Sequence, residues 1–495
     1  MDRAQTYDDL AALQALAAAI RECPLYAAMA DLASAEAAPV YVVGGTVRDA
    51  LLGRPWHDLD LALAPERVVP VARALAWRAG GTLVPLDERL PTVRVVAGAG
   101  DERREVDLSG LRGADLRADL MARDLTVNAL AVPLGDARDG RGARVIDPAG
   151  GIADLRDHKI RVPAASVLDD DPLRLLRVHR FAATLGFTVD PATRDAVRAR
   201  REMLASSAVE RIAEELFRLL AAPGAGARLT DLWEDGLLAV VFPELAAMDG
   251  VTQNTFHHLD ILGHTLEACR AFDVVRAHPA RFFGEHAANV DGYLSSGQNA
   301  ALVLLAVLLH DIAKPATRFV DEGGVHFHCH EALGAQMTEA IGARLHLANR
   351  HVEVLVRWVA HHLGLKDLIG LYREERLPDR TVRRFLRRAG DDLAGLLCVV
   401  LADTRATRGP DFPADGEALL LEVSRRLLAE DAARRADPQN AAPLLKGRDL
   451  IGELGLAPGP RLGELLAGVE EARWDGLVRD RDEALAWVRS RLTES

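Results

Sequence analysis

One change in the spacing of apolar residues divides this chain into two kinds of structure. Between residues 40 and 110, short apolar or alternating runs have the length and composition of β-strands. They are VYVV (40–43), LDLAL (59–63), TVRVVAG (92–98) and REVDLS (104–109). From Asp169 to the C-terminus, apolar residues recur almost throughout at helical spacing, with Gly and Pro at the breaks. The pattern predicts an α+β multidomain protein in which a small mixed α/β head precedes an all-α body.

The length and composition agree with several globular domains. A chain of 495 residues is too long for one ordinary core. Its share of hydrophobic residues (49%) and charged residues (27%) is typical of globular proteins. The four cysteines form no CxxC pair, which favours reduced thiols in a cytoplasmic protein. The sequence starts without a basic region before a long apolar core, so we expect neither a secretory signal nor a membrane partner.

Breaks in the helical pattern predict five parts. The polar stretch 284–299 lies between two helical runs and is predicted to be a surface loop. The predicted parts are an N-terminal helical extension (1–36), the α/β head (37–163), a helical neck and body (164–250), a second helical domain (255–408) and a helical tail (409–495).

A glycine pair follows the first predicted strand of the head. The run VYVVGGTVRDALLG indicates a strand, a turn at Gly44 and Gly45, and a helix. Glycines allow backbone amides to approach a phosphate closely, and the N-terminus of the next helix favours anions. Arg48 lies where its guanidinium could hold a triphosphate. A simple tight turn would have the same sequence, so this run alone is weak evidence.

Two aspartates stand on the next predicted strand, HDLDLAL. Asp58 and Asp60 are two residues apart, so they point to the same face of a strand. Neighbouring carboxylates repel each other unless a cation lies between them, and hard oxygen ligands suit Mg²⁺. We therefore predict a catalytic Mg²⁺ site of the two-metal type. A third carboxylate could come from Glu105 or Asp107, with Asp107 preferred.

Four ordered sequence motifs resemble the class II tRNA nucleotidyltransferase and bacterial poly(A) polymerase family. They cover residues 40 to about 250. They are GGTVRDALLG followed by HDLDLAL, the segment RDLTVNALA (123–131), DPAGGIADL (147–155) and DDPLRLLRVHRFAATLGF (170–187). Ala122 replaces the first Arg of the family's RRD, and Asp170 replaces its Glu.

The resemblance implies roles for the matching residues. Asp58 and Asp60 would bind the catalytic Mg²⁺, and Asp124 would contact the ribose. Asp171 and Arg174 would read the edge of the incoming base, although Asp171 before Pro172 would also suit a helix N-cap. The full predicted nucleotide-binding set is Gly44, Gly45, Arg48, Arg123, Asp124, Asn128, Asp171, Arg174, Arg177 and Arg180.

A second set of possible metal ligands lies on the later helices. The run LLAVLLHDIAKP places a His-Asp pair at the end of an apolar helix, where burial is costly without a metal or a partner. The pattern resembles the HD superfamily of metal phosphohydrolases, in which imidazole and carboxylate ligands hold a transition-metal ion or Mg²⁺. His326 and His328 are predicted to be loop residues. The predicted metal ligands are His264, His310, Asp311, His330, His361 and Asp403, with His362 as the alternative to His361.

The net charge of −13 does not by itself favour an RNA partner, because phosphate contacts need Lys and Arg. Two arginine-rich runs could still supply a basic groove. For either run a solvated helix face is the simpler interpretation. The runs are Arg174, Arg177, Arg180, Arg194, Arg198, Arg200 and Arg201, and then Arg380, Arg383, Arg384, Arg387 and Arg388.

Together these features predict a template-independent nucleotidyltransferase that uses ATP and CTP to complete the CCA end of tRNA, fused to an HD phosphohydrolase site. Poly(A) addition, or addition of CC alone or A alone, uses the same chemistry and stays open. A working HD phosphodiesterase with a nucleotide-sensing head is the alternative from another class. A third hypothesis is a non-enzymatic scaffold protein in which both sites are inactive.

Overall fold

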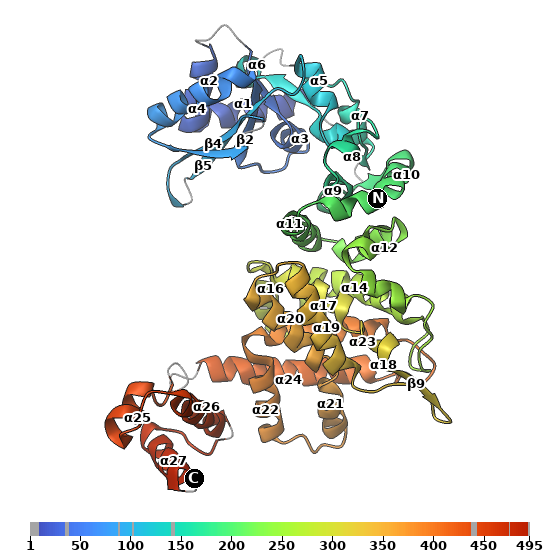
Figure 1. Ribbon diagram of the computed structural model, residues 1–495, viewed down its shortest axis with the longest axis vertical. Coiled ribbons are helices and arrows are strands. Elements are labelled where there is room, and N and C mark those ends of the chain that lie inside the picture. Colours follow the sequence, from blue (N-terminus) through green and yellow to red (C-terminus); the bar gives the residue numbers. More distant parts are fainter. Residues whose placement is uncertain are drawn as a thin grey trace. The chain divides into compact units, whose positions relative to one another are not determined.

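The computed structural model describes residues 9–34, 39–87, 90–100, 103–139, 144–436, 443–474 and 476–493. The chain forms two compact units. The first contains residues 1–215 and 234–240, and the second contains residues 216–233 and 241–495. Figure 1 shows a mixed α/β head in the first unit and helices almost throughout the second, which confirms the predicted fold class.

The head is built on a six-stranded mixed sheet in the order β3-β4-β5-β2-β1-β6. The central pair β2 and β5 is parallel, and the other pairs are antiparallel. Four of these strands were predicted from alternation; β3 and the three-residue β6 were not. The strands are β1 (Tyr41–Val43), β2 (Asp58–Leu63), β3 (Thr82–Asp87), β4 (Thr92–Ala97), β5 (Arg104–Gly110) and β6 (Ala131–Pro133).

Helices cover the sheet and fix the start of β2. Helix α4 (Pro65–Ala79) buries Val68, Val71 and Leu75. The predicted N-terminal helical extension forms α1 (Asp9–Glu22) and α2 (Pro24–Ser34). The hydroxyl of Tyr26 donates a 2.5 Å hydrogen bond to the carbonyl of His57, immediately before Asp58. The other head elements are α3 (Gly45–Leu51), α5 (Leu116–Met121), η2 (Thr126–Asn128), α6 (Leu134–Asp139), α7 (Gly151–Arg156) and β7 (Lys159–Ile160).

A buried ion cluster holds the helices that follow the head. Asp235, 1% exposed, lies 3.2 Å from His179, 2.9 Å from Arg194 and 2.8 Å from Arg198. These three side chains come from α9 (Arg174–Leu185) and α10 (Pro191–Arg200). The cluster thus joins two neck helices through one carboxylate. The neighbouring elements are α8 (Val167–Asp170), β8 (Thr188–Val189), η3 (Arg201–Ser206) and α11 (Val209–Leu220).

We expect Asp235→Asn to lower the free energy of unfolding by about 3 kcal/mol, because it removes the buried carboxylate that pairs with the partly buried Arg194 and Arg198. Burial alone would raise the pKa of Asp235, but hydrogen bonds from His179 and Arg194 lower it to about 2. The folded-state pKa is therefore below the unfolded value of about 3.9, so this stabilisation is present above pH 4 and is lost as pH falls towards 2. Urea unfolding between pH 3 and 7 would measure both effects. An equal unfolding free energy for variant and parent at pH 7 would contradict this role.

The second unit is a helical domain around α17 (Asn299–Leu309), all of whose residues from Ala300 onward are buried. The stretch Asn299–Thr317 has the length and hydropathy of a possible membrane span, but 83% of it is buried within the protein, as in the central helix of a packed domain. Around it lie α14 (Ile261–Ala277), α19 (His330–Arg344), α20 (Asn349–His361), α23 (Leu393–Ala406) and α24 (Gly416–Ala436). The remaining elements before the tail are α12 (Ala225–Glu234), α13 (Leu237–Val241), η4 (Pro243–Met248), α15 (Pro279–Phe283), α18 (Lys314–Thr317), α21 (Leu365–Arg373), α22 (Asp379–Ala389) and η6 (Gly390–Asp392).

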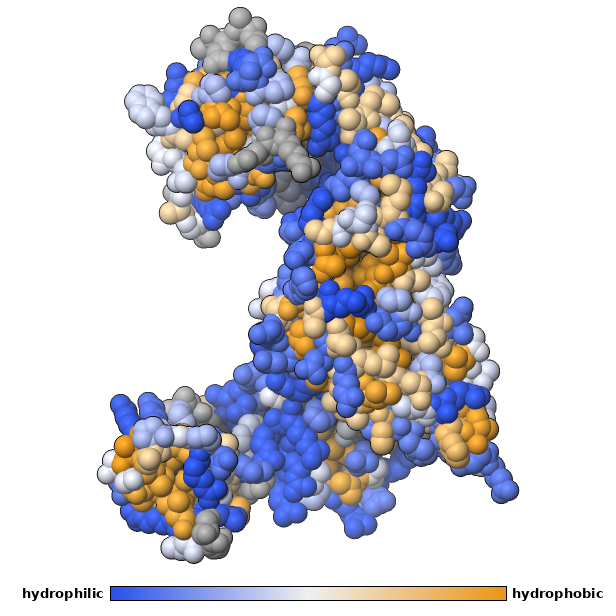
Figure 2. Space-filling view, viewed as in Figure 1, coloured by the Kyte–Doolittle hydropathy of each residue, from blue (hydrophilic) through white to orange (hydrophobic). Residues whose placement is uncertain are grey.

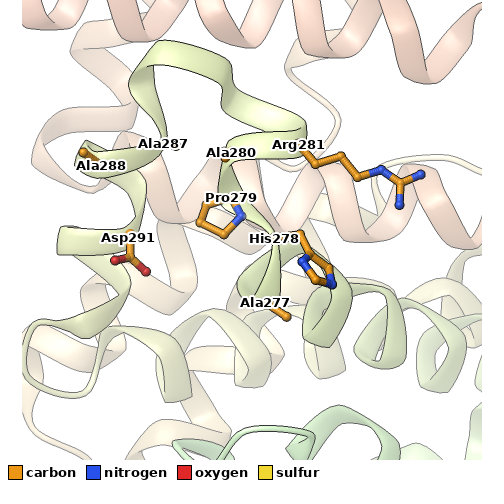
Figure 3. Close-up of a pocket in the computed structure, with 8 residues that line it drawn as sticks. All are labelled: Ala277, His278, Pro279, Ala280, Arg281, Ala287, Ala288 and Asp291. Carbon is orange, nitrogen blue, oxygen red and sulfur yellow. The ribbon is translucent and has the colours of Figure 1, made fainter. Parts of the chain in front are cut away.

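The prediction of a loop at 284–299 is wrong. Most of it forms η5 (Gly284–His286) and α16 (Ala287–Ser295), because Val290 and Leu294 are spaced one turn apart and are buried. Figure 3 shows a groove beside this helix, lined mainly by small side chains such as Ala280 and Ala288. It contains none of the predicted site residues.

Two further features complete the second unit. An antiparallel hairpin, β9 (Arg318–Asp321) and β10 (Gly324–Phe327), interrupts the helices. The tail helices α25 (Gly447–Leu454), α26 (Pro460–Trp474) and α27 (Arg481–Thr493) share a small apolar core that includes Leu450 and Val488. The five-part division of the chain stays a prediction.

Candidate active site and metal centre

The glycine turn of the head lies directly beside the catalytic strand. Gly44 has a φ of +68°, which favours glycine, and a side chain there would meet Arg123 Nη1 at 2.9 Å. A Cβ atom on Gly45 would lie 3.4 Å from the Asp60 carboxylate. Helix α3 begins at Gly45, so its N-terminal amides open towards the same place. The turn predicted to hold phosphate and one predicted metal ligand are therefore adjacent.

A single hydroxyl joins this turn to strand β2. The Thr46 hydroxyl donates to the Asp58 carbonyl at 3.1 Å and accepts from the Asp60 amide at 3.0 Å. Thr46 is 2% exposed, so water does not replace these bonds easily. Thr46 was not predicted as a site residue, because a Thr after a glycine pair carries no recognisable signal for a contact 12 to 14 residues away.

Thr46→Val is expected to lower kcat for nucleotide addition about 10-fold, since two buried backbone groups lose a partner and the two aspartates lose their fixed position. Thr46→Ser keeps the hydroxyl and should stay within about 3-fold of the parent. Steady-state kinetics at saturating nucleotide, with melting curves for both variants, would measure this. A loss in Thr46→Ser equal to that in Thr46→Val would contradict the hydroxyl as the group that positions the two aspartates.

The carboxylates of β2 and β5 form a concentrated negative site. Asp60 pairs with Asp107 across the parallel strands, and Asp58 pairs with Glu105. Burial and the Asp107 carboxylate raise the pKa of Asp60 to about 6, and burial and Glu105 raise that of Asp58. Arg94 neutralises part of this charge through two 2.8 Å bonds to Asp107. A divalent cation at Asp58 and Asp60 would relieve the remaining repulsion, so the donor set fits Mg²⁺.

A hydrogen-bonded network connects the turn with helix α9. Arg48 donates to Asn128 at 2.6 Å, and Asn128 donates to Asp124 at 3.0 Å. Asp124 also accepts from Arg177 Nε at 2.9 Å. Burial alone would raise the pKa of Asp124, but Arg177 and Asn128 lower it to about 2, so it is a fixed anion. The structure thus brings four predicted nucleotide-binding residues into one network.

Three guanidiniums surround the ring of Phe181. Arg48, Arg177 and Arg180 lie 5.1, 5.5 and 3.9 Å from its centroid. Glu215 holds Arg180 through a 2.6 Å ion pair. Neither Phe181 nor Glu215 was predicted as a site residue, although Phe181 lies inside the motif that indicated the family.

The predicted base-reading pair is engaged by the protein itself. Asp171 accepts from the amide of Leu173 at 3.2 Å and from Arg211 at 3.0 Å, and the buried Arg174 donates to the carbonyl of Val167 at 2.8 Å. The contact with Leu173 is a local turn bond, because the N-cap of α9 is Leu173 and no side chain caps that helix. A base-reading role for this pair stays a prediction.

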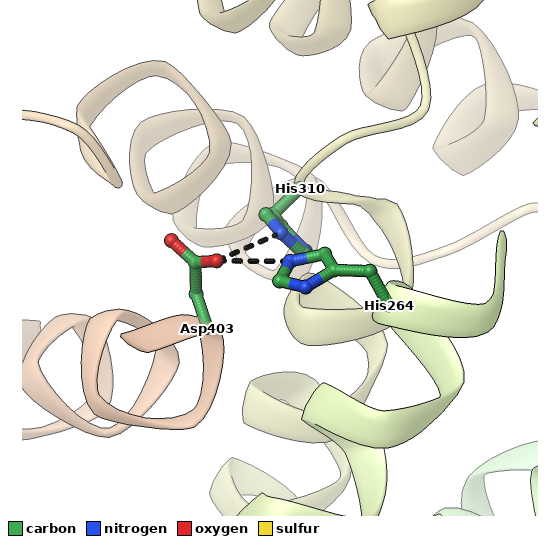
Figure 4. Close-up of side chains that lie close together, drawn as sticks. All are labelled: His264, His310 and Asp403. Carbon is green, nitrogen blue, oxygen red and sulfur yellow. Dashed lines mark hydrogen bonds and ion pairs between the residues drawn. The ribbon is translucent and has the colours of Figure 1, made fainter. Parts of the chain in front are cut away.

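The second unit gathers histidines and aspartates around the His-Asp pair. Figure 4 shows His264 and His310 pointing at the same oxygen of Asp403, at 3.0 and 3.6 Å. The same cluster also contains Asp311, Lys314, His330 and His362. Burial alone would lower the pKa of His310, but Asp311 and Asp403 raise it to about 10. A metal ion could take the place of the protons that such buried imidazole and carboxylate groups otherwise share.

The ligand atoms form two groups, each compact enough for one ion. The first is His264, His310 and Asp403, and the second is Asp311, His330 and His362, with the atoms of each group within 4.8 Å of one another. Asp311 links the groups, because its Oδ2 lies 3.1 Å from His310 and its Oδ1 lies 3.4 Å from His330. Both oxygens are buried. Oδ2 faces the Lys314 ammonium at 2.6 Å, whereas Oδ1 makes no hydrogen bond among the described residues. A buried carboxylate with one oxygen still open between two imidazole groups fits a pair of metal ions sharing one carboxylate.

The structure groups His362, not the predicted His361, with the other candidate ligands, so which of the two binds a metal stays a prediction. His362 is 2% exposed and lies 3.3 Å from His330, whereas His361 is half-buried outside both groups. Burial, Arg388 and Arg357 lower the pKa of His361, so its surroundings are cationic and do not suit a metal. His326 lies on β10 and not in a loop, while His328 follows that strand.

A cavity of about 500 Å³ opens over the candidate metal ligands. Lys314, which lies 2.6 Å from Asp311, is one of the residues that line it.

Three families match successive parts of this chain. The poly(A) polymerase head domain matches residues 40–161, a probable RNA- and SrmB-binding site of polymerase A matches residues 186–249, and the HD domain matches residues 280–406. Divalent metals are general cofactors of such head and HD domains.

Known proteins resemble the chain along almost its whole length. An A-adding tRNA nucleotidyltransferase of Deinococcus radiodurans is 37% identical over 90% of this chain and 94% of its own. A CC-adding tRNA nucleotidyltransferase of Thermus thermophilus is 35% identical over 90% and 92%. A solved CCA-adding enzyme in complex with CTP has the same fold, with a TM-score of 0.60 and 20% identity over 97% of this chain and 98% of that one. This chain therefore belongs to the tRNA nucleotidyltransferase family and is a nucleotidyltransferase that carries an HD domain.

Proposed function

We propose that this protein adds CMP and AMP to the 3′ end of tRNA without a nucleic-acid template, and so completes the CCA end. The observation that carries the proposal is the Asp60 carboxylate, 3.4 Å from the Cβ position of Gly45. Metal ligand and phosphate turn are thereby close enough to act on one nucleoside triphosphate. The proposed substrates are ATP, CTP and tRNA, and the proposed location is the cytoplasm, where all three occur together.

Each part of the head has a role in this reaction. Asp58 and Asp60 would hold Mg²⁺, which lowers the barrier to attack of the RNA 3′-hydroxyl on the α-phosphate and neutralises the leaving pyrophosphate. The amides at Gly44 and Gly45, with Arg48 and Arg123, would bind the triphosphate. Asn128, Asp124 and Arg177 would orient the sugar and base. Asp171, Arg174 and the Arg180 side chain beside Phe181 would contribute to the same pocket.

Single-nucleotide assays separate CCA addition from its alternatives. Purified protein would receive tRNA ending at the discriminator base, or tRNA ending in CC, with labelled CTP or ATP alone. Complete CCA addition requires CMP on the first substrate and AMP on the second. Incorporation on only one substrate would establish CC addition or A addition, the activities named for the relatives from Thermus and Deinococcus. ATP incorporation on arbitrary RNA would establish a poly(A) polymerase.

The HD domain supports a second function, metal-dependent hydrolysis of a phosphoester. Two ligand groups sharing Asp311 carry this proposal. A transition-metal ion or Mg²⁺ at His264, His310, Asp403, Asp311, His330 and His362 would activate water and polarise the phosphoryl oxygen. Lys314 and the cavity above the ligands would position the substrate. Hydrolysis of 2′,3′-cyclic AMP with Mg²⁺, Mn²⁺, Co²⁺ or Ni²⁺ would test it, and no turnover with any of these ions would contradict it.

A further inference from the structure

The two arginine-rich runs differ in how many of their arginines pair with carboxylates of the protein. In the first run the guanidiniums are used inside the protein. Arg194 and Arg198 bind Asp235, and Arg200 binds Asp169 at 2.6 Å. Arg177 and Arg180 are likewise bound, to Asp124 and Glu215. This run therefore offers few free cations to an RNA.

The second run lies on α22, which presents its arginines in two directions. Val382, Phe385 and Leu386 are buried and fix the helix on the domain. On one flank, Arg387 forms a 2.6 Å ion pair with Glu471 of the tail. On that flank Arg383 is half-buried and has a buried Nε. Arg383 and Arg387 therefore face the protein, which leaves three of the five arginines of the run.

The other three arginines, Arg380, Arg384 and Arg388, are exposed and spaced four residues apart. We call them the α22 arginine row. Residues i and i+4 lie on one helix face about 6 Å apart along the axis, so the row is about 12 Å long. Among the described residues no carboxylate lies within ion-pair distance of any of the three, and Figure 2 shows a hydrophilic surface over this helix.

Such a row is unfavourable unless an anion binds it. Like charges at i and i+4 destabilise a helix, and in this chain of net charge −13 acidic partners are abundant, yet the row has none. Arg384 and Arg388 also line a cavity of about 200 Å³ together with the hydroxyl-bearing Thr381, which has room for a phosphate group. Asp367 is the one carboxylate among the residues that line it. Guanidiniums bind phosphate through paired, directed hydrogen bonds.

We propose that the α22 arginine row binds the phosphodiester backbone of the RNA substrate, at a contact on the HD-bearing unit that is separate from the nucleotidyltransferase head. This proposal rests on the proposed tRNA substrate for the identity of the RNA. Its chemistry is phosphate neutralisation without base reading, so it would raise affinity for any tRNA of suitable shape and would not select the added nucleotide.

Binding of tRNA without its CCA end, measured by fluorescence anisotropy in the absence of nucleotide at several KCl concentrations, tests the row. The triple variant R380Q/R384Q/R388Q should bind about 10- to 100-fold more weakly at low salt, and the slope of log Kd against log salt should fall by about 2 to 3. A matched control is R270Q/R376Q/R435Q. It removes the same charge from exposed arginines that each have a carboxylate partner, namely Glu267, Glu374 and Asp431.

The outcomes separate this proposal from the nucleotidyltransferase function. If the row binds RNA, the triple variant loses affinity, the control does not, and R380K/R384K/R388K recovers most of the affinity. In nucleotide addition, KM for tRNA should rise about 10-fold while kcat at saturating tRNA stays within 2-fold. Equal losses in the triple variant and the control, or an unchanged salt slope, would overturn the row as an RNA contact, even if the head adds nucleotides normally. Preferential binding of an acidic protein by the row would overturn it too.

Discussion

Replacing Asp60 with asparagine should lower the rate of nucleotide addition by about 10³-fold or more. The carboxylate lies beside the glycine turn and opposite Asp107, so the substitution removes one of the two carboxylates positioned to hold Mg²⁺ next to the triphosphate. A metal that stabilises the transition state by several kcal/mol corresponds to about three decades in rate. Incorporation of labelled CMP or AMP into tRNA under single-turnover conditions would measure the loss. Hydrolysis by the HD domain should be unchanged.

A surface carboxylate provides the control for this experiment. Asp157→Asn removes the same charge from an exposed ion pair with Lys159 and should leave addition within about 2-fold. Melting curves would separate lost catalysis from lost folding. Asp60→Asn with more than about a tenth of the parent activity would contradict a metal-ligand role for Asp60.

The sequence was sufficient for the parts of the site that depend on short-range geometry. Same-face placement of Asp58 and Asp60 follows from the two-residue period of a strand, and the glycine turn before α3 follows from the strand-turn-helix pattern. The confirmed strands β2, β4 and β5 alternate apolar and polar residues, and β1 is a short apolar run before the glycine turn. The motif order also identified the family without knowledge of any contact.

Contacts between distant segments could not be predicted in this way. The Thr46 hydroxyl on α3 contacts the backbone of β2, and Glu215 on α11 contacts Arg180 on α9. Neither contact is marked by a pattern of neighbouring residues in the sequence. Neighbouring histidines posed a similar problem. His361 and His362 differ by about 100° around α20, and only the packing of that helix decides which one faces His330. The helix α16 was missed because its polar residues outnumber its two buried anchors.

The strand β3 illustrates a different limit. Its residues are mostly exposed and include Pro85, so propensity alone argues against a strand. It lies at the edge of the sheet and pairs with β4 on one side only. An edge strand tolerates a proline and exposed apolar residues such as Leu86. The segment is a strand because it pairs with β4, and its own sequence does not indicate that pairing.

Asp311→Asn is expected to remove bound metal from the HD domain and to abolish phosphoester hydrolysis, with nucleotide addition retained. Burial alone would raise the pKa of Asp311, but His310 and Lys314 hold it well below its usual value, so the side chain is an anion able to serve both ligand groups. Loss of a supporting contact alone weakens metal binding about 10- to 100-fold, so loss of the shared ligand should exceed about 100-fold. Elemental analysis of protein purified from metal-supplemented medium would measure this directly.

The adjacent histidines supply a sharp comparison for the same assay. His362→Ala should lose metal from the second group, whereas His361→Ala should keep the metal content of the parent, because only His362 faces Asp311 and His330. Removing one residue from a buried ionic cluster can also unfold the domain, so each variant needs a melting curve with and without added metal. A metal at Asp311 predicts that added Mn²⁺ raises the melting temperature of the parent and of His361→Ala but not of Asp311→Asn. If all three proteins respond alike, the bound ion lies elsewhere and the His-Asp cluster is a structural network of the core.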